Sequence, residues 1–182
     1  MTRPSPLQLE TIFYPTVSYK ASHVSADKSP QNPIPVEIHA FVTFREKGNH
    51  FAFLSLEQKN ENGECPFSLD VTVFCAFDIN MDIARKTYPP TNMSSYIAVN
   101  IARILYSGAR EVISTTTARS PNGSANIESV LIEKEDVDVA FEGAGEQAEI
   151  IERIFGLAQS NSEKVTAKDR RSQSKVHTRS SE

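Results

Sequence analysis

The chain has 182 residues, of which 39% are hydrophobic and 23% charged, and its formal net charge is −4 at pH 7. This length allows one domain with its own core and is short for two. The acidic balance disfavours a dedicated nucleic-acid-binding protein. No run approaches the roughly 18 consecutive apolar residues of a membrane helix, and the N-terminal residues lack the apolar core of a signal peptide. We therefore expect a cytoplasmic protein that does not insert into a membrane.

The first third of the chain predicts two strands. In the segment from Leu7 to Ser22, Pro15 indicates a bulge or an edge position, because proline has no N–H to donate to a neighbouring strand. Apolar and polar residues alternate from Val36 to Arg45, which is typical of a strand with one buried face. Phe41 is the exception, since it falls on the polar face of this second strand.

Two more strands follow after short turns. Phe51 to Leu56 predicts a returning strand, although its apolar residues fall on both faces. The alternation from Phe67 to Phe77 is the strongest in the chain, and here Phe74 lies on the polar face. The connections Lys47-Gly48-Asn49 and Asn62-Gly63 are short, so neighbouring strands are expected to be antiparallel.

A long helix is predicted next. Ser94 or Ser95 can cap it by accepting a hydrogen bond from a free N–H of the first turn, and its apolar stripe continues to about Arg119. Gly108 lies inside this pattern, where glycine costs about 1 kcal/mol relative to alanine. We take it as a sign that another element approaches closely.

The rest of the chain predicts a short helix and a polar tail. The segment from Ile127 to Phe141 fits either a strand or an extended linker, and Gly145 to Leu157 predicts a helix with one apolar face. Residues 160–182 have almost nothing to bury, and their six basic and three acidic residues give a charge of +3. We expect a domain over residues 1–159 and a disordered basic tail over 160–182. The alternative for the tail is a basic arm that touches an acidic partner or RNA.

No motif for catalysis or metal binding is present in the sequence. The histidines His23, His39, His50 and His177 are scattered, and the glycines do not cluster into a phosphate-binding loop. Cys65 and Cys75 have no zinc-ligand spacing, and Cys75 lies in an alternating apolar strand where a small buried residue is expected. The sequence therefore predicts a protein that is not an enzyme and uses no metal or cofactor.

The order of these patterns resembles the SecB family of export chaperones. The segments that carry the resemblance are Leu7-Gln8-Leu9-Glu10-Thr11-Ile12-Phe13-Tyr14 with Val17-Ser18-Tyr19, Phe67 to Ile79, Ile104 to Arg119, and Val137 to Phe141. The resemblance covers roughly Leu7 to Phe155. It implies an α+β fold, with a four-stranded antiparallel sheet followed by a long helix and a shorter C-terminal helix. It also implies a homotetramer, formed by two dimers that associate through their long helices.

The same resemblance implies an ATP-independent holdase that binds unfolded or nascent polypeptides. Such a chaperone needs exposed apolar and aromatic surface, because its clients offer hydrophobic segments rather than one fixed shape. The client role is either protein export or protection of one specific client, such as an antitoxin. The residues expected to bind polypeptide are Tyr14, Tyr19, Phe41, Phe74, Phe77, Ile150, Ile154 and Phe155. Those expected at the oligomer interface are Ile101, Leu105, Gly108, Ala109 and Val112.

One departure from the family concerns the SecA translocase motor. SecB proteins dock this motor through acidic residues on the first and fourth strands, where the present chain has Thr16 and Lys20 and keeps only Asp70. Lysine reverses the sign of such a contact, so repulsion replaces attraction. Asp70 is therefore the single expected partner-binding residue, and the chain is SecB-like rather than a standard export SecB.

A second hypothesis belongs to another class. In a dedicated assembly adaptor, the same apolar faces would be buried permanently against one folded partner or against copies of the chain. A holdase suppresses the aggregation of several unrelated unfolded proteins, whereas an adaptor of this kind leaves them unaffected.

Overall fold

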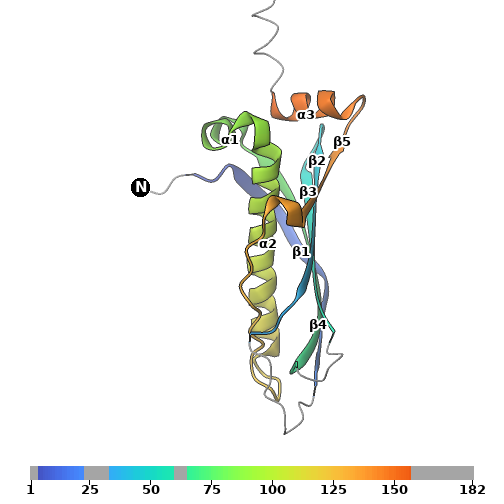
Figure 1. Cartoon of the computed structure of the whole chain (residues 1–182), viewed down its shortest axis with the longest axis vertical. Helices are drawn as coiled ribbons and strands as arrows, with labels where there is room; N and C mark the ends of the chain where they lie inside the picture. Colours follow the sequence, from blue (N-terminus) through green and yellow to red (C-terminus); the bar gives the residue numbers. More distant parts are fainter. Residues whose placement is uncertain (1–3, 23–32, 60–64, 157–182) are drawn as a thin grey trace, which may run out of the picture.

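The computed structural model describes residues 4–22, 33–59 and 65–156, so the predicted tail over 160–182 lies outside the described residues. A long helix covers one face of a sheet, and two short helices lie at one end of it (Figure 1). The strands are β1 (Leu7–Ala21), β2 (Glu37–Arg45), β3 (His50–Gln58), β4 (Phe67–Ile79) and β5 (Val137–Glu142). The helices are α1 (Met81–Thr87), α2 (Met93–Thr117) and α3 (Gln147–Phe155), with 3₁₀ turns at Pro90–Asn92 and Lys134–Asp136.

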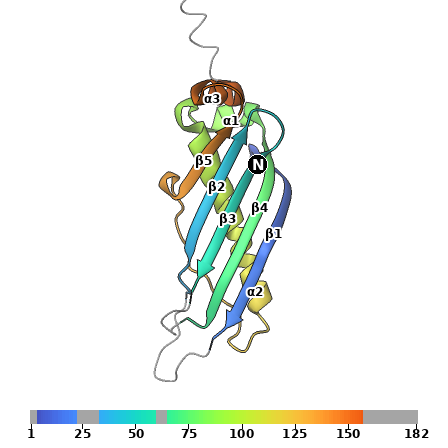
Figure 2. The same cartoon turned by 90° about the vertical axis from the view of Figure 1, so that its right-hand side faces the viewer.

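The sheet has five strands in the order β1-β4-β3-β2-β5 (Figure 2). The pairs β2–β3 and β3–β4 are antiparallel, as the short connections predict, and β1 is antiparallel to β4. The fifth strand corrects the four-stranded prediction: Val137–Glu142, at the end of the segment left open between strand and linker, pairs parallel with β2. The α+β class, the long helix and the shorter C-terminal helix are confirmed.

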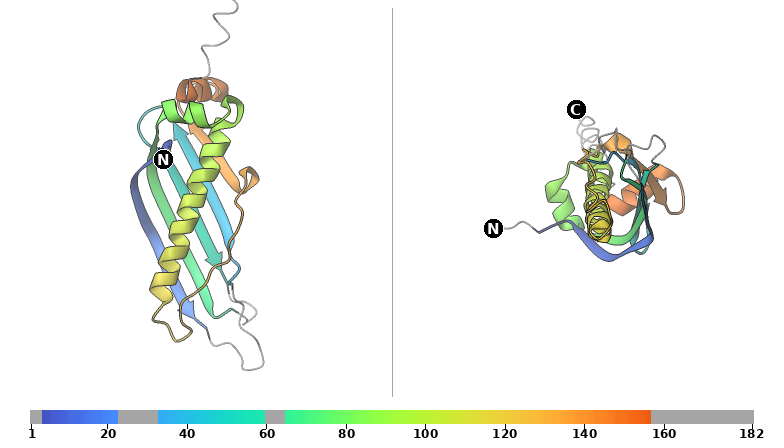
Figure 3. Two further views of the ribbon diagram at one scale, coloured as in Figure 1. Left: turned by 90° about the vertical axis from the view of Figure 1, so that its left-hand side faces the viewer. Right: turned by 90° about the horizontal axis from the view of Figure 1, so that it is seen from below.

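The hydrophobic core lies between the sheet and α2 (Figure 3). Alternating residues of the strands point toward the helix and are buried, with Phe44, Leu54, Val73 and Phe77 at most 1% exposed. The facing stripe of α2 is formed by side chains four residues apart, the spacing that keeps one face of a helix against a sheet. These stripe residues are Ile97, Ile101, Leu105, Ala109 and Ile113.

Strand β1 is an edge strand with two irregularities. Its register against β4 shifts between Leu9 and Thr11 and again between Phe13 and Thr16, the interval that contains Pro15. The bulge and the edge position predicted from Pro15 are therefore confirmed. At the second shift, the inserted residue also changes which side chains of β1 point to which face of the sheet.

The ends of the helices differ in part from the sequence expectation. α2 begins at Met93 with Asn92 at its N-cap and no side-chain cap, so the predicted cap by Ser94 or Ser95 is wrong. α1 was not predicted, and its seven residues are too few for a periodic signal; its cap is the side chain of Asn80, whose Oδ1 accepts a hydrogen bond from Ile83 N at 3.2 Å. α3 ends at Gly156, whose φ of 66° is the left-handed conformation that glycine favours.

Candidate functional site

An aromatic row crosses the face of the sheet that is turned away from α2. In the strand registers, Phe41 of β2 lies beside Phe53 of β3, Phe53 beside Phe74 of β4, and Phe74 beside Phe13 of β1. We call these four residues the aromatic row. The rings of Phe13 and Phe74 are 4.8 Å apart, so the row continues onto the edge strand. Four phenylalanines from four adjacent strands thus form one surface.

This surface is open in the described chain. Figures 1 and 2 show no described helix over this face of the sheet. Phe13, Phe41 and Phe53 are 47%, 42% and 37% exposed. Isolated exposed apolar side chains are ordinary on protein surfaces, but neighbouring large ones mark binding sites more often. The row is therefore the strongest candidate for a binding surface.

A fifth ring enlarges the aromatic row toward one end of the sheet. Phe51 lies next to Phe74, with ring centroids 5.4 Å apart. The guanidinium of Arg45 lies over the Phe51 ring, 5.1 Å from its centroid, and its Nε forms an ion pair with Glu142 at 2.9 Å. Arg45 thus covers one side of Phe51, so the exposed part of the surface remains centred on the aromatic row.

Polar rows follow the aromatic row toward the other end of the sheet. Two residues along the strands from the aromatic row lies a row of polar register neighbours: His39, Ser55, Thr72 and Thr16. After two further residues come Glu37, Glu57 and Asp70, which are also neighbours in the registers. We call these three the acidic row. At about 3.3 Å per residue, four residues place it about 13 Å from the aromatic row on the same face.

A second apolar surface lies on the other face, along edge strand β1. Leu9, Ile12, Val17 and Tyr19 face the same side as α2 and are 39–42% exposed. Tyr14, near the bulge, crosses toward α2: a Cβ at Gly108 would lie 3.0 Å from the Tyr14 hydroxyl. This contact is the close approach that Gly108 predicted.

The predicted polypeptide-binding residues divide between surface and core. Phe41 and Phe74 belong to the aromatic row, Tyr19 is exposed on β1, and Tyr14 is half-buried against α2. Phe77, Ile150 and Phe155 are buried in the core, and Ile154 is half-buried. A polypeptide cannot contact the three core residues in this conformation, so their predicted role stays a prediction.

The predicted oligomer-interface residues of α2 mostly face the chain's own sheet. Ile101, Leu105 and Ala109 are buried in the core, while Gly108 and Val112 are half-buried. The amphipathic stripe thus packs within the chain. The interface role of these residues stays a prediction, and so does the partner-binding role of Asp70, which lies in the acidic row on the open face.

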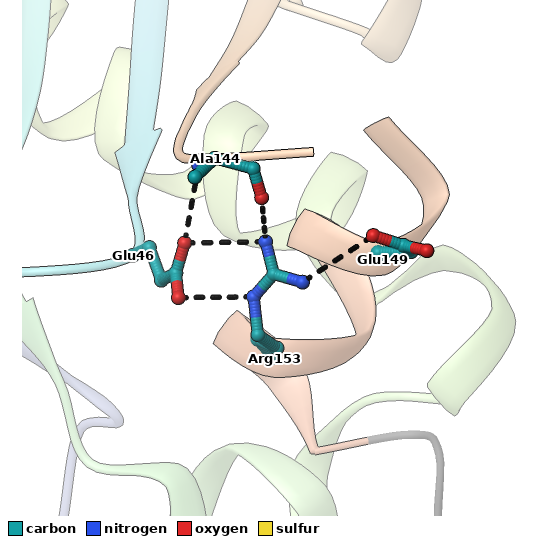
Figure 4. Close-up of polar contacts among 4 residues, drawn as sticks. All are labelled: Glu46, Ala144, Glu149 and Arg153. Atoms are coloured by element: carbon teal, nitrogen blue, oxygen red, sulfur yellow. Dashed lines mark hydrogen bonds and ion pairs between the residues drawn. The ribbon is translucent and has the colours of Figure 1, made fainter. Parts of the chain in front are cut away.

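Helix α3 is attached to the end of the sheet by a polar cluster (Figure 4). Arg153 donates hydrogen bonds to both carboxylate oxygens of Glu46, at 2.9 and 3.2 Å, and to the carbonyl of Ala144. Arg153 also pairs with Glu149 at 3.7 Å. The hydrogen bond from Arg153 lowers the pKa of Glu46. Beneath α3, the ring of Phe155 packs against Phe44 with centroids 5.3 Å apart.

Neither the titratable groups nor the thiols form a catalytic arrangement in the described residues. His50 is buried between Phe44 and Phe77, its Nδ1 accepts a hydrogen bond from the backbone N–H of Arg45 at 3.1 Å, and burial lowers its pKa. Both cysteines are buried, and burial raises the pKa of Cys75 to about 11, which disfavours a reactive thiolate. Among the described residues, no group of His, Cys, Asp or Glu could hold a metal ion.

A similar solved structure has a SecB-like fold. It is the SecB-like chaperone Rv1957 of Mycobacterium tuberculosis, in complex with a ChAD peptide from the HigA1 antitoxin. The TM-score is 0.46 at 15% identity, and the match covers 69% of the present chain and 91% of that chain. This is a similarity of fold. No family model matches the sequence, and no curated protein matches it.

Three of the ring-bearing positions on this face, Phe13, Phe51 and Phe53, are not among the predicted binding residues. The apolar residues on both faces of β3 were a usable signal, because Phe51 and Phe53 alternate with the buried residues Ala52 and Leu54. Phe13 carried no such signal, since its face depends on the register of β1 around its bulges.

Within the described helices, none is long and apolar enough to span a membrane.

Proposed function

We propose that the protein is a chaperone that holds unfolded or nascent polypeptides, without ATP or a cofactor. The observation that supports this proposal most directly is the aromatic row, a set of exposed phenylalanine rings on an open sheet face. The sequence resemblance to SecB supports it independently. Binding, rather than catalysis, is the activity that such a surface can provide.

The energetics of the row suit a binder of many sequences. Complete burial of a phenylalanine side chain contributes roughly 1.5–3 kcal/mol, so covering rings that are about 40% exposed contributes about 1 kcal/mol each. The three rings exposed to this extent, Phe13, Phe41 and Phe53, give about 3 kcal/mol, which alone corresponds to affinity in the millimolar range. Tighter binding requires a client that also uses other surfaces, such as the exposed side chains of β1, or several copies of the chain. Contacts of this kind select for apolar content rather than for one sequence.

We include an oligomeric assembly in the proposal, a homotetramer built as a dimer of dimers, working in the cytoplasm. The open edge of β1 and its exposed apolar side chains, Leu9, Ile12, Val17 and Tyr19, offer a surface for such association. The client is either an exported protein or one specific unstable protein such as an antitoxin. The SecA motor stays an open alternative partner, through Asp70, because Thr16 and Lys20 of β1 stand where the SecB family has acidic residues.

The test is light scattering from two unrelated denatured proteins diluted into buffer without nucleotide. The wild-type protein is expected to suppress the aggregation of both at stoichiometric amounts. The variant Phe41→Thr/Phe53→Thr is expected to lose most of this effect, because threonine keeps the strand preference but removes the rings. Leu131→Thr, at a 71% exposed residue outside the row, is the matched control and is expected to act as wild type.

The alternative, an adaptor that binds one folded partner, makes the opposite prediction in the same experiment. If a folded wild-type sample suppresses the aggregation of neither denatured protein, the holdase proposal is contradicted and the adaptor is favoured. Equal suppression by wild type and the Phe41→Thr/Phe53→Thr variant would contradict the role of the aromatic row.

A further inference from the structure

The open face of the sheet has an excess of acidic side chains beside its aromatic row. Registers and alternation place six carboxylates on this face, against the two cationic side chains of Lys20 and Arg45 on its strands. The acidic residues are Glu37, Glu57, Asp70, Asp78, Asp138 and Glu142. Arg45 is already paired with Glu142. The face therefore presents an apolar centre with a negatively charged surround.

Repulsion within the acidic row is only partly compensated. Glu37, Glu57 and Asp70 are direct neighbours on three adjacent strands, where like charges destabilise a sheet. Within the described ranges, the ion pairs of this row consist of Glu57 with Lys59, at 3.4 Å between Nζ and Oε2. A cationic segment lying across this face would remove the repulsion.

The chain itself contains a segment of the complementary charge. Residues 157–182 carry six basic and three acidic residues, a net charge of +3. The basic residues are Lys164, Lys168, Arg170, Arg171, Lys175 and Arg179. This segment follows Gly156, which ends α3 at the end of the sheet opposite the acidic row (Figure 2).

The length of the segment is sufficient for it to cross the sheet. Nine residues of β2 span about 30 Å, and the segment must first pass from Gly156, which lies beside Arg85 of α1, over the end of the sheet to the open face, about 10 Å more. The 14 residues from Gly156 to Arg170 reach at most about 50 Å when extended. Lys168, Arg170 and Arg171 can therefore reach the acidic row after the chain has passed over the aromatic row.

We propose that residues 157–182 dock on the open face of the sheet of the same chain, with their basic residues on the acidic row. The docked segment crosses the aromatic row and competes there with a polypeptide client. This consequence rests on the proposed chaperone function, whereas the docking itself does not. The contact is electrostatic and solvent-exposed, so a client that covers several rings can displace it, and salt weakens it.

Zero-length carbodiimide cross-linking of the full chain, followed by peptide mass spectrometry, tests the docking without any client. Lys164, Lys168 or Lys175 is expected to cross-link to Glu37, Glu57 or Asp70, and at least three-fold less at 0.5 M salt. Mixing isotope-labelled and unlabelled protein separates links within a chain from links between chains. Cross-links that are absent, that occur only between chains, or that fall mainly on carboxylates outside the open face would overturn the proposal.

A charge-reversal variant provides the matched comparison. Arg170→Glu/Arg171→Glu keeps the three reporter lysines but removes the attraction, so the cross-link yield is expected to fall at least three-fold. Lys86→Glu/Arg119→Glu makes the same change in net charge on exposed residues of the described chain and is expected to leave the yield unchanged. Equal yields in the two variants would overturn the electrostatic contact.

The effect on the client separates this proposal from the proposed function. If docking competes with binding, Arg170→Glu/Arg171→Glu should bind an unfolded client at least three-fold more tightly than wild type. Cross-links without any client binding would contradict the chaperone function and leave the docking intact. Client binding without cross-links would overturn the docking and leave the chaperone function intact.

Discussion

The ring of Phe13 packs against that of Phe74 on the open face of the sheet, with centroids 4.8 Å apart and planes inclined by 37°. The two residues come from an edge strand and its neighbour, and they are register partners between the two shifts of β1. This pair extends the aromatic row to the edge of the sheet. Aromatic pairs of this kind contribute about 0.5–1.5 kcal/mol beyond the area that they bury.

Phe74 and Phe77 of β4 provide a test that separates binding from stability, because they point to opposite faces. Phe77 is fully buried, so Phe77→Ala is expected to lower the free energy of unfolding by about 3–5 kcal/mol. Phe74→Thr is expected to cost about 1–3 kcal/mol, the value of its two ring contacts at about 0.5–1.5 kcal/mol each, while weakening client binding. Urea denaturation and client titration measure the two effects. Similar destabilisation by both variants would contradict the assignment of the two faces.

The contact between Tyr14 and Gly108 predicts a coupling between β1 and α2. Alanine at position 108 gains about 1 kcal/mol of helix propensity, but its Cβ would meet the Tyr14 hydroxyl at 3.0 Å. Tyr14→Phe removes that hydroxyl. Gly108→Ala is therefore expected to stabilise the protein more in the Tyr14→Phe background than in wild type, as measured by a double-mutant cycle of unfolding free energies. Strict additivity would show that the hydroxyl does not limit this site.

His50 is expected to make the free energy of unfolding depend on pH below about 6.5. Burial lowers its pKa from 6.5, so the folded chain favours the neutral imidazole. As the pH falls below 6.5, the unfolded chain takes up a proton that the folded chain does not, and stability is lost until the pH passes the lowered pKa. His50→Gln should reduce the difference in unfolding free energy between pH 7.5 and 5.5. If the difference in unfolding free energy is the same in His50→Gln as in wild type, titratable groups other than His50 cause it.

Glu46 is expected to act in a lower pH range. The hydrogen bond from Arg153 lowers the pKa of Glu46 from 4.5, so the stabilisation that this pair gives is complete above pH 4.5 and is lost as the pH falls through the lowered value. The affected element is α3. The protection of α3 amides against hydrogen exchange, measured relative to the intrinsic rate at each pH, should therefore fall below pH 4.5, and Glu46→Gln should show reduced protection at neutral pH already. Exchange rates of α3 that match between wild type and variant at pH 7 would contradict the attachment.

The sequence was sufficient to predict the parts of the fold that depend on local periodicity. β2 and β4 alternate as predicted, and Phe41 and Phe74 lie on the open face because their neighbours Ala40, Val42, Val73 and Cys75 point to the core. The stripe of α2 follows from its three- and four-residue spacing. The resemblance to SecB implied how these elements assemble, as one antiparallel sheet followed by a long and a shorter helix, which periodicity alone does not determine.

Other features depend on contacts between distant residues. β5 pairs with β2 although Val137 and Ala40 are 97 positions apart, so its local pattern could not separate a strand from a linker. The face of Phe13 depends on the irregular register of β1, and the burial of Phe77 and Phe155 depends on α2 and α3 covering that end of the sheet. Local patterns were therefore sufficient to predict Phe41 and Phe74 as members of the aromatic row, but not Phe13 and Phe53.

The central claim is that the aromatic row binds unfolded polypeptide, and fluorescence anisotropy of a labelled, permanently unfolded client tests it most directly. The titration compares wild type with Phe41→Thr/Phe53→Thr and with the control Leu131→Thr. Loss of two rings worth about 1 kcal/mol each predicts roughly five- to thirty-fold weaker binding by the double variant and no change in the control. Wild-type affinity in the folded double variant would contradict the claim and place the binding surface elsewhere on the chain.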